Sequence, residues 1–325
     1  MRQRKLNFDK FHGANLLKID VLAILVTMCL CAGVMAQQAG QKTFSSAEEA
    51  SKALAMAAES NDQKALLEIL GPQGKQIILS GDAAEDSESR AIFVERYREM
   101  HRLVREPDGT TILYIGAHNW PTPIPLLQKG KVWYFDTEAG KKEILYRRIG
   151  RNEVSAMHVC RELVAAQKEY SGQRGEFAQK IFSDEGQQNG LYWKAANGQP
   201  QSPIGPLVAS AVVEANYAQS QVGAATPYRG YYFHVLTRQG KNAPGGAKSY
   251  LANGKMSEGF AFVAYPAVYR SSGVMTFIVG ADGTVYEKDL GGKTDALGKN
   301  MKVFNPDSTW KKTGEQQGEM GSETK

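Results

Sequence analysis

The side chains that could carry out catalysis are few and lie far apart along the chain. Cys160 is the only cysteine after residue 31, and the histidines that follow the N-terminal segment are His101, His118, His158 and His234. No two of these histidines form a His-x-x-x-His or His-Glu-x-x-His pair, the spacing that places two zinc ligands on one helix face. The sequence therefore predicts no metal site and no cofactor.

Cys160 is the one candidate for a cysteine nucleophile. It lies one helical turn from Met157 and Val164, on the apolar side of a predicted helix, whereas His158 falls on the polar side. Buried cysteines usually pack as small apolar side chains and are unreactive. We therefore expect Cys160 to belong to the core and His158 to face solvent.

The C-terminal region contains two motifs known from penicillin-binding enzymes. Ser308-Thr309-Trp310-Lys311 matches Ser-x-x-Lys, and Lys312-Thr313-Gly314 matches Lys-Thr-Gly. In those enzymes the motifs lie on separate elements that converge in space, whereas here one follows the other directly. We reject the match. Because the chain also lacks a Gly-x-Ser-x-Gly elbow, a phosphate-binding loop and a dinucleotide-binding glycine pattern, the sequence predicts no catalytic residues.

A concentration of aromatic side chains is the best candidate for a ligand site. His118 and Trp120 precede a proline-rich stretch, and Trp133 and Tyr134 follow it. Ligand pockets are mostly apolar and contain a few polar groups, so these four residues predict a pocket. Simple core packing is the alternative, because aromatic side chains are commonly buried.

Residues 1–36 have the pattern of a cleaved secretory signal. The basic residues that open it are Arg2, Arg4, Lys5, Lys10 and Lys18. The apolar stretch that follows, Val21 to Val34, is fourteen residues long, whereas a membrane-spanning helix needs about 20. Val34 and Ala36 suit a cleavage site, so we expect the mature protein to begin at Gln37, with an uncleaved anchor as the alternative.

Export changes what the composition implies about partners and location. The leader carries +3 of the formal net charge of +5, which leaves +2 on the mature chain. So small a charge gives no reason to expect a nucleic-acid partner, which needs a clustered basic surface. After cleavage we expect no membrane span and a periplasmic or secreted location. With Cys160 alone, the mature fold cannot contain an internal disulfide and must depend on its packed core.

The mature chain has the pattern of an α+β protein with two domains. In the first, residues 43–149, helices are predicted from Ser46 onward, over 64–70 and over 88–104, followed by a strand over 110–116 and a hairpin with strands at 123–127 and 131–136. Helices followed by meandering strands indicate helices packed on one face of an antiparallel sheet.

The second domain, residues 150–310, begins with a predicted helix over 153–170. We expect Val154, Met157, Cys160, Val164 and Gln167 on its apolar face. A polar loop and a helix over 207–217 follow, and then strands at 231–236, 259–265, 274–279 and 284–287. Residues 311–325 have the composition of a polar, disordered tail.

Two fold resemblances accompany these patterns. Pro125-Leu126-Leu127 with Lys129-Gly130-Lys131-Val132-Trp133-Tyr134-Phe135 resembles the strand pair of nuclear-transport-factor-like domains, which are cone-shaped and have a curved sheet. Gly230-Tyr231-Tyr232-Phe233, Ala264-Tyr265-Pro266 and Phe277-Ile278-Val279-Gly280-Ala281-Asp282-Gly283 resemble segments of type IV pilin-like domains, in which a long helix packs on an antiparallel sheet. The leader lacks a prepilin junction, which speaks against assembly into a pilus.

Residues 43–310 resemble the bacterial exported family catalogued as domain of unknown function 2950. The segments that carry the resemblance are Asn119-Trp120-Pro121-Thr122-Pro123-Ile124-Pro125, Asp136-Thr137-Glu138-Ala139-Gly140-Lys141, Arg147-Arg148-Ile149-Gly150-Arg151-Asn152-Glu153 and Ala243-Pro244-Gly245-Gly246-Ala247. The resemblance implies an exported protein of two parts and brings no activity with it.

Three hypotheses about function follow from these observations. The first is a non-enzymatic protein that binds an envelope partner through its second domain. The second is a small-molecule-binding or lyase/isomerase-like activity in the cone of the first domain, which predicts a pocket near Trp120 and Trp133. The third is an assembly or maturation factor for surface filaments, which depends on fold analogy alone.

Overall fold

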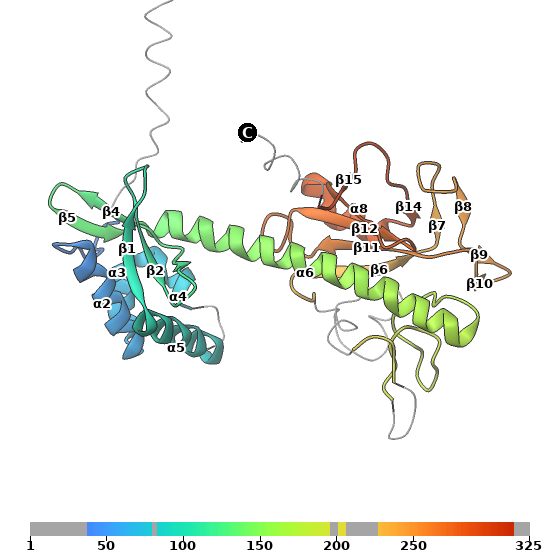
Figure 1. Cartoon of the computed structure of the whole chain (residues 1–325), viewed down its shortest axis with the longest axis horizontal. Helices are drawn as coiled ribbons and strands as arrows, with labels where there is room; N and C mark the ends of the chain where they lie inside the picture. Colours follow the sequence, from blue (N-terminus) through green and yellow to red (C-terminus); the bar gives the residue numbers. More distant parts are fainter. Residues whose placement is uncertain (1–37, 80–82, 196–200, 206–226, 315–325) are drawn as a thin grey trace, which may run out of the picture. The chain divides into compact units, whose positions relative to one another are not determined.

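The computed structural model describes residues 38–79, 83–195, 201–205 and 227–314, and its fold is mixed α+β, as predicted (Figure 1). The chain divides into two compact units, Met1–Lys141 and Lys142–Lys325, which we call unit 1 and unit 2. The predicted signal segment 1–36 and the helix predicted over 207–217 lie outside the described residues.

Helices form the first half of unit 1: α2 (Ala47–Glu59), α3 (Gln63–Leu70), the 3-10 helix η1 (Pro72–Gly74), α4 (Lys75–Ile78) and α5 (Ala83–Glu99). Ser46 caps α2 by accepting a hydrogen bond from the backbone N–H of Glu49, which confirms the predicted start of this helix. Asp62 caps α3 in the same way, through the N–H of Ala65. Gly71 ends α3 with a φ of 74°, a left-handed value that glycine adopts without strain.

The strands of unit 1 form one antiparallel sheet: β1 (His101–Arg105), β2 (Thr111–Ile115), β3 (Trp120–Pro121), β4 (Leu126–Lys129) and β5 (Val132–Phe135). The order is β1-β2-β4-β5, and β3 pairs with β2. β4 and β5 are the predicted hairpin, in which Leu126 lies opposite Phe135. Both side chains are buried on the face that the helices cover, against Leu66, Ile69 and Leu70 of α3.

The segment 101–105 is a strand, although the sequence predicted a helix over 88–104. Helix α5 ends at Glu99, and β1 then pairs along its whole length with β2, with His101 opposite Ile115 and Arg105 opposite Thr111. Tyr97, Met100 and Val104 also fit a helical spacing, so local periodicity favoured one long helix. Backbone hydrogen bonds to β2 make residues 101–105 a strand. These bonds come from residues 111–115, which lie outside the segment 88–104 that was predicted to be helical.

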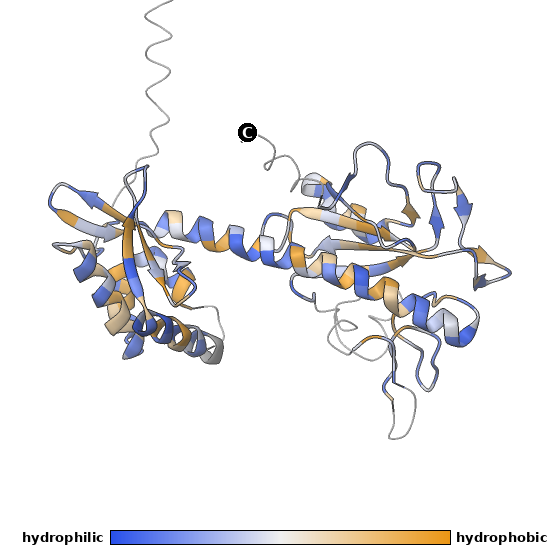
Figure 2. Cartoon of the chain, viewed as in Figure 1, coloured by the Kyte–Doolittle hydropathy of each residue, from blue (hydrophilic) through white to orange (hydrophobic). Residues whose placement is uncertain are grey.

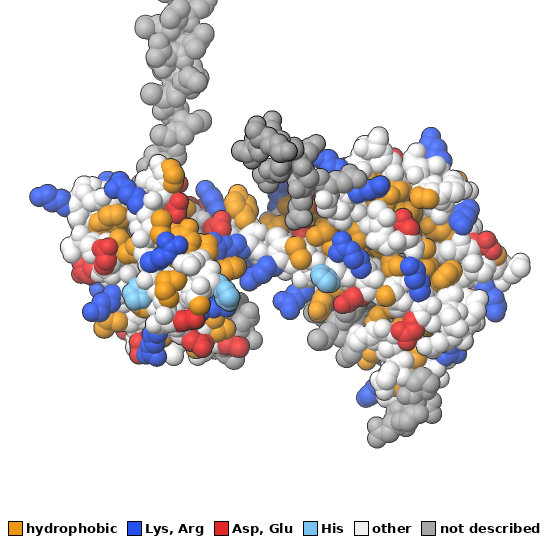
Figure 3. Space-filling view, viewed as in Figure 1, with side chains coloured by type: hydrophobic (Ala, Val, Ile, Leu, Met, Phe, Trp, Pro, Cys, Tyr) orange, Lys and Arg blue, Asp and Glu red, His pale blue; other side chains and the backbone are white. Residues whose placement is uncertain are grey.

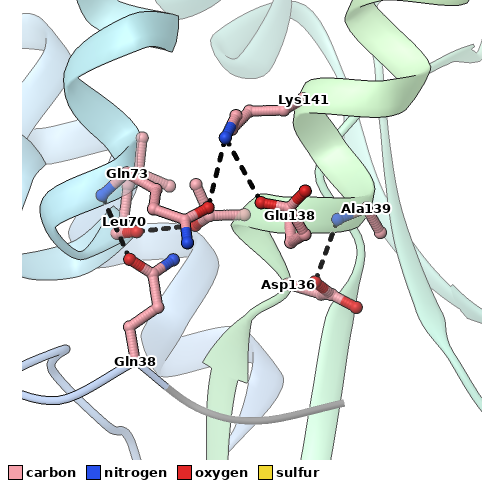
Figure 4. Close-up of polar contacts among 8 residues, drawn as sticks. Gln38, Leu70, Gln73, Asp136, Glu138, Ala139 and Lys141 are labelled. Carbon is pink, nitrogen blue, oxygen red and sulfur yellow. Dashed lines mark hydrogen bonds and ion pairs between the residues drawn. The ribbon is translucent and has the colours of Figure 1, made fainter. Parts of the chain in front are cut away.

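Helix α6 (Thr137–Arg174) follows β5 directly, and its first turn is held by polar contacts within unit 1 (Figure 4). Asp136 accepts a hydrogen bond from the N–H of Ala139 at 3.0 Å, as an N-cap does. The Thr137 hydroxyl donates to the carbonyl of Leu70 at 2.6 Å. Lys141 contacts both Glu138 and the side chain of Gln73, so the helix start is joined to the end of α3 and to η1.

The sequence predicted that this helix begins at Glu153, but it begins at Thr137 and runs through Gly150 without a break. Ion pairs join Lys141 to Glu138 and Arg147 to Glu143 along this part of the helix. Pairs at these i,i+3 and i,i+4 spacings stabilise helices. A single glycine in a helix interior costs only about 1 kcal/mol, so Gly150 does not end the helix.

Unit 2 is built on an antiparallel sheet in the order β15-β13-β12-β11-β6. Its strands are β6 (Tyr231–Leu236), β11 (Ala261–Pro266), β12 (Met275–Gly280), β13 (Val285–Asp289) and β15 (Lys311–Lys312). The four predicted strands are confirmed. β15 corrects the prediction of a tail without structure from residue 311, since Lys311 pairs with Glu287 and Lys312 with Tyr286.

Helix α6 supplies much of the core on one face of this sheet. Its buried residues there are Ala156, Val159, Cys160, Leu163, Val164, Ala166, Gln167 and Tyr170. Cys160 is fully buried, as predicted. Val154 is 55% exposed, against the prediction, because it lies about 160° around the helix from Ala156 at 100° per residue.

The opposite face of the sheet is covered by α8 (Thr294–Asn300) and by β14 (Val303–Phe304). Tyr265 packs against Gly298 of α8, and Phe304 lies edge-on to Tyr286. The remaining strands are short: β7 (Arg238–Gln239), β8 (Lys248–Ser249), β9 (Leu251–Ala252) and β10 (Lys255–Met256), beside the 3-10 helix η2 (Gly291–Lys293). Within the described residues no helix is long and apolar enough to cross a membrane, and Figure 2 shows hydrophilic residues along the whole of α6.

Candidate functional site

The structure places His118 and Trp120 at the surface of unit 1. His118 lies in the turn between β2 and β3 and is exposed, and Trp120 of β3 is 50% exposed. Between them, Asn119 has a φ of 50°, a left-handed conformation that asparagine tolerates better than most residues. The turn therefore holds its side chains in a defined direction.

Trp133 and Tyr134 are neighbours on β5 and so point to opposite faces of the sheet. Trp133 packs on the helix-covered core, whereas Tyr134 is 3% exposed and lies outside that core cluster. Trp120 pairs with Ile115 at one end of β2, and the hairpin of Trp133 joins β2 at Thr111. Four residues of strand separate these ends by about 13 Å, so the four predicted residues do not converge on one point.

A pocket of about 380 Å³ opens elsewhere in unit 1, between the end of α2 and α5. Its lining residues are Ala58, Glu59, Asn61, Ser87, Ala91, Val94, Glu95 and Arg98. The charged end of Arg98 forms an ion pair with Glu59, and Arg90 donates to Asn61 at 2.8 Å. Glu59, Asn61 and Arg98 at this pocket therefore already have polar partners, and these contacts link α5 to the end of α2.

The guanidinium of Arg102 on β1 is an exposed charge that two contacts orient. Arg102 lies opposite Tyr114 of β2, and its guanidinium carbon is 4.7 Å from the centre of that ring. Its Nε–H donates to Oδ1 of Asn119 at 2.7 Å. The face of unit 1 shown in Figure 3 carries Lys or Arg side chains among hydrophobic ones.

Half-buried apolar residues adjoin Arg102 on the same face of the sheet, which we call the Arg102 face. Val104 lies opposite Ile112, and Tyr114 lies opposite Pro121. By strand alternation all of them share the side of Arg102, opposite the helices. Sequence reasoning missed this face because it assigned residues 101–104 to a helix; only the register of β1 against β2 brings Arg102 onto Tyr114.

In unit 2 the side chains that could act as nucleophiles or acids, Cys160 and Tyr231, lie in the core. Burial raises the pKa of the Cys160 thiol to about 12, which disfavours the thiolate form that would act as a nucleophile at neutral pH. Burial also raises the pKa of Tyr231, whose hydroxyl donates to the carbonyl of Met275 at 2.8 Å. Both side chains are part of the buried core of unit 2.

His234 is buried and its Nε2 lies 2.9 Å from the carbonyl of Met301, so this nitrogen carries the proton and donates it. Burial lowers the pKa of His234, because the charged ring would lose its hydration, although the hydrogen bond to Met301 opposes this effect. The folded protein therefore disfavours protonation of His234 relative to the unfolded chain.

Acidification is expected to destabilise unit 2 through His234. Below the ordinary histidine pKa of 6.5 the unfolded chain binds a proton that the folded protein resists, so stability is lost as pH falls from 6.5 towards the folded pKa. One proton contributes at most about 1.4 kcal/mol per pH unit. Thermal unfolding measured from pH 7 to pH 5 should show that the stability of His234→Gln falls less over this range than the stability of wild type. His158→Gln, at an exposed position, should retain the wild-type loss; equal slopes in all three proteins would contradict this assignment.

The carboxylate of Glu153 joins α6 to the start of β12. One oxygen accepts hydrogen bonds from the backbone N–H of Val274 at 2.8 Å and of Met275 at 3.0 Å. Burial raises the pKa of the nearby Glu287, and the charge of Glu153 adds to this effect. The two carboxylates therefore lie close enough to interact, and Glu153 uses its charge to satisfy the backbone.

The turn between β11 and β12, residues 268–272, exposes Val268 and Arg270 and is held by several hydrogen bonds; we call it the Val268 loop. Ser272 fixes it by accepting a hydrogen bond from Val268 N–H at 3.0 Å, and Asn152 of α6 donates to the Ser272 carbonyl at 2.8 Å. The guanidinium of Arg270 lies 5.3 Å from the ring of Tyr269. Val268 is 58% exposed, so the loop presents an aliphatic, an aromatic and a cationic side chain together.

Across the described part of the chain, no three His, Cys, Asp or Glu side chains are grouped so that they could hold a metal ion. The described residues form a two-unit α+β protein that presents the Arg102 guanidinium in unit 1 and the Val268 loop in unit 2. The chain belongs to the family described as a protein of unknown function (DUF2950), whose model matches residues 41–313. No curated protein and no solved structure gives a match.

Proposed function

We propose that the protein is exported through its N-terminal segment and acts outside the cytoplasm as a non-enzymatic binding protein that contacts a protein partner through the Val268 loop of unit 2. In this proposal, cleavage after Ala36 yields a periplasmic or secreted bacterial envelope protein without a membrane span. The observation that carries the proposal is the exposure of Val268 and Arg270 beside the half-buried Tyr269 on one short loop that hydrogen bonds hold in place.

The composition and rigidity of the Val268 loop support binding. Tyrosine and arginine are enriched among the residues that dominate the energy of protein interfaces. A loop that is already fixed loses little conformational freedom on binding, and this favours affinity. Here Ser272, Asn152 and a 3.1 Å hydrogen bond from Tyr269 to Asp289 hold the loop in place.

The structural roles of the reactive groups support a non-enzymatic function. Cys160 lies in the core, and His234 bonds to the backbone of the Met301 turn. The helix α6 on an antiparallel meander also suits the pilin-like interpretation of unit 2, as the helices on the sheet of unit 1 suit a nuclear-transport-factor-like interpretation. Both likenesses are proposals about architecture and assign no ligand.

The proposal is tested with protein isolated from its native host. N-terminal sequencing should find Gln37 first, and a chain that still begins with Met1 in the cell interior would contradict export. Cross-linking in the envelope should recover the same partner with wild type and with Leu297→Asp, a control on another surface where the wild-type side chain is 48% exposed. Val268→Asp should recover at least about tenfold less, the effect of a 1.4 kcal/mol loss. Equal recovery by all three proteins would exclude the loop.

A further inference from the structure

We propose that unit 1 carries a binding site for a ligand with a single carboxylate on a flat apolar body, and that Arg102 holds the carboxylate. This site is separate from the Val268 loop and lies in the other unit. The juxtaposition that carries the inference is the Arg102 guanidinium, stacked on Tyr114 and hydrogen-bonded to Asn119, beside the apolar residues of the Arg102 face.

Two neutral partners fix the direction of the guanidinium. The ring of Tyr114 supports it from one side at 4.7 Å, and Asn119 accepts the hydrogen bond from Nε at 2.7 Å. Asn119 is itself held in a left-handed conformation, with a φ of 50°, by the turn before β3. An arginine oriented in this way has already lost the side-chain freedom that binding would otherwise remove.

The same contacts leave the far end of the guanidinium available. Within the described residues, Nη1 and Nη2 of Arg102 have no hydrogen-bond partner and the side chain is exposed. The charge of Arg147, by contrast, is paired with a carboxylate, because its Nε bonds to Glu143 at 2.7 Å. Since neither Tyr114 nor Asn119 is charged, these two contacts do not neutralise the positive charge of Arg102, and the parallel N–H groups of Nη1 and Nη2 fit the two oxygens of a carboxylate.

The surroundings select the kind of oxyanion. The Tyr114 hydroxyl donates to the carboxylate of Glu106 at 3.2 Å, which places one negative charge beside the stack. Inorganic phosphate has no apolar body, so it would gain nothing from the apolar surface beside Arg102, whereas a carboxylate on a flat apolar body would. The half-buried side chains of Val104, Ile112 and Pro121 offer apolar surface to the body of the ligand.

Benzoate is a suitable probe, because it joins one carboxylate to a flat apolar ring. Its binding to the purified protein is measured by ligand-observed NMR titration, with benzamide as the neutral isostere and inorganic phosphate as the alternative anion. We expect binding of benzoate in the millimolar range, no binding of benzamide, and weaker binding of phosphate. Tighter binding of phosphate, or equal binding of benzamide, would overturn the assignment, as would the absence of benzoate binding.

Paired substitutions test whether Arg102 is the residue responsible. Arg102→Lys keeps the charge but removes the two parallel N–H groups of the guanidinium, so benzoate affinity should fall at least about tenfold. Arg105→Lys is the matched control, on the same strand but on the opposite side by alternation, and should change affinity less than about twofold. Asn119→Gly keeps the positive φ and removes the amide, so affinity should fall by about threefold. Equal effects of Arg102→Lys and Arg105→Lys would show a general charge effect and refute the site, whether or not a partner binds unit 2.

Discussion

Replacing Gly298 by alanine is expected to destabilise unit 2 by about 2–3 kcal/mol, although alanine is the better helix former. A Cβ added to Gly298 in α8 would lie 2.4 Å from Cγ of Tyr265, and that ring is only 1% exposed. Neither the helix nor the buried ring can move without opening the contact between α8 and β11. For a unit of this size the midpoint of thermal unfolding should fall by roughly 4–12 °C.

The same change at Gly150 is the matched control, because both glycines lie within helices. A Cβ at Gly150 has nothing within 4 Å, and the position is exposed. Gly150→Ala should therefore raise stability by about 0.5–1 kcal/mol, the usual gain of alanine over glycine in a helix. Thermal unfolding followed by circular dichroism compares the two variants. Loss of stability in Gly150→Ala, or a neutral Gly298→Ala, would contradict the packing described for α6 or α8.

Removal of the Glu153 side chain should lower the stability of unit 2 by about 2–4 kcal/mol. In Glu153→Ala the N–H groups of Val274 and Met275 lose a charged acceptor, and hydrogen bonds to charged groups contribute about 1.5–3 kcal/mol each. Two effects make the total loss of stability smaller than the sum of two such bonds. Glu153 is only half-buried, and its removal takes away the repulsion between its charge and Glu287.

Urea unfolding of Glu153→Ala is best compared with Glu162→Ala. Glu162 lies on the same helix and is exposed, and its loss should change stability by less than about 0.5 kcal/mol. Hydrogen exchange gives a second readout, because the amides of Val274 and Met275 should exchange faster in Glu153→Ala. A Glu153→Ala protein as stable as Glu162→Ala, with both amides still protected, would show that the carboxylate does not hold the start of β12.

The elements that the sequence predicted correctly are those with short-range signals. Ser46 with Glu49 defines the start of α2, and Gly71-Pro72 defines the end of α3. Asp282-Gly283 predicts the turn between β12 and β13, where Gly283 has a φ of 81°. Each signal acts within about four residues, so neither neighbouring strands nor distant helices are needed to read it.

The Arg102 face could not be predicted, for the opposite reason. Arg102, Tyr114 and Asn119 come together only when β1 pairs with β2. The local spacing of Tyr97, Met100 and Val104 instead fits a helix that continues beyond Glu99, where α5 ends. Similarly, Trp120 and Trp133 are close in sequence, but Trp120 pairs with Ile115 at one end of β2, whereas Trp133 lies in the hairpin that joins β2 at Thr111.

The sequence by itself therefore determined the α+β class, the family, most of the strands of unit 2 and the burial of Cys160. Tertiary structure decided that 101–105 is a strand, that α6 begins at Thr137, and which polar groups are oriented at the surface. Capping, turn formation and hydrophobic periodicity depend on residues that lie close together in the chain, so they can be recognised in the sequence. Strand pairing and side-chain stacking join residues that are distant in the chain, so their outcome depends on the register of the whole sheet.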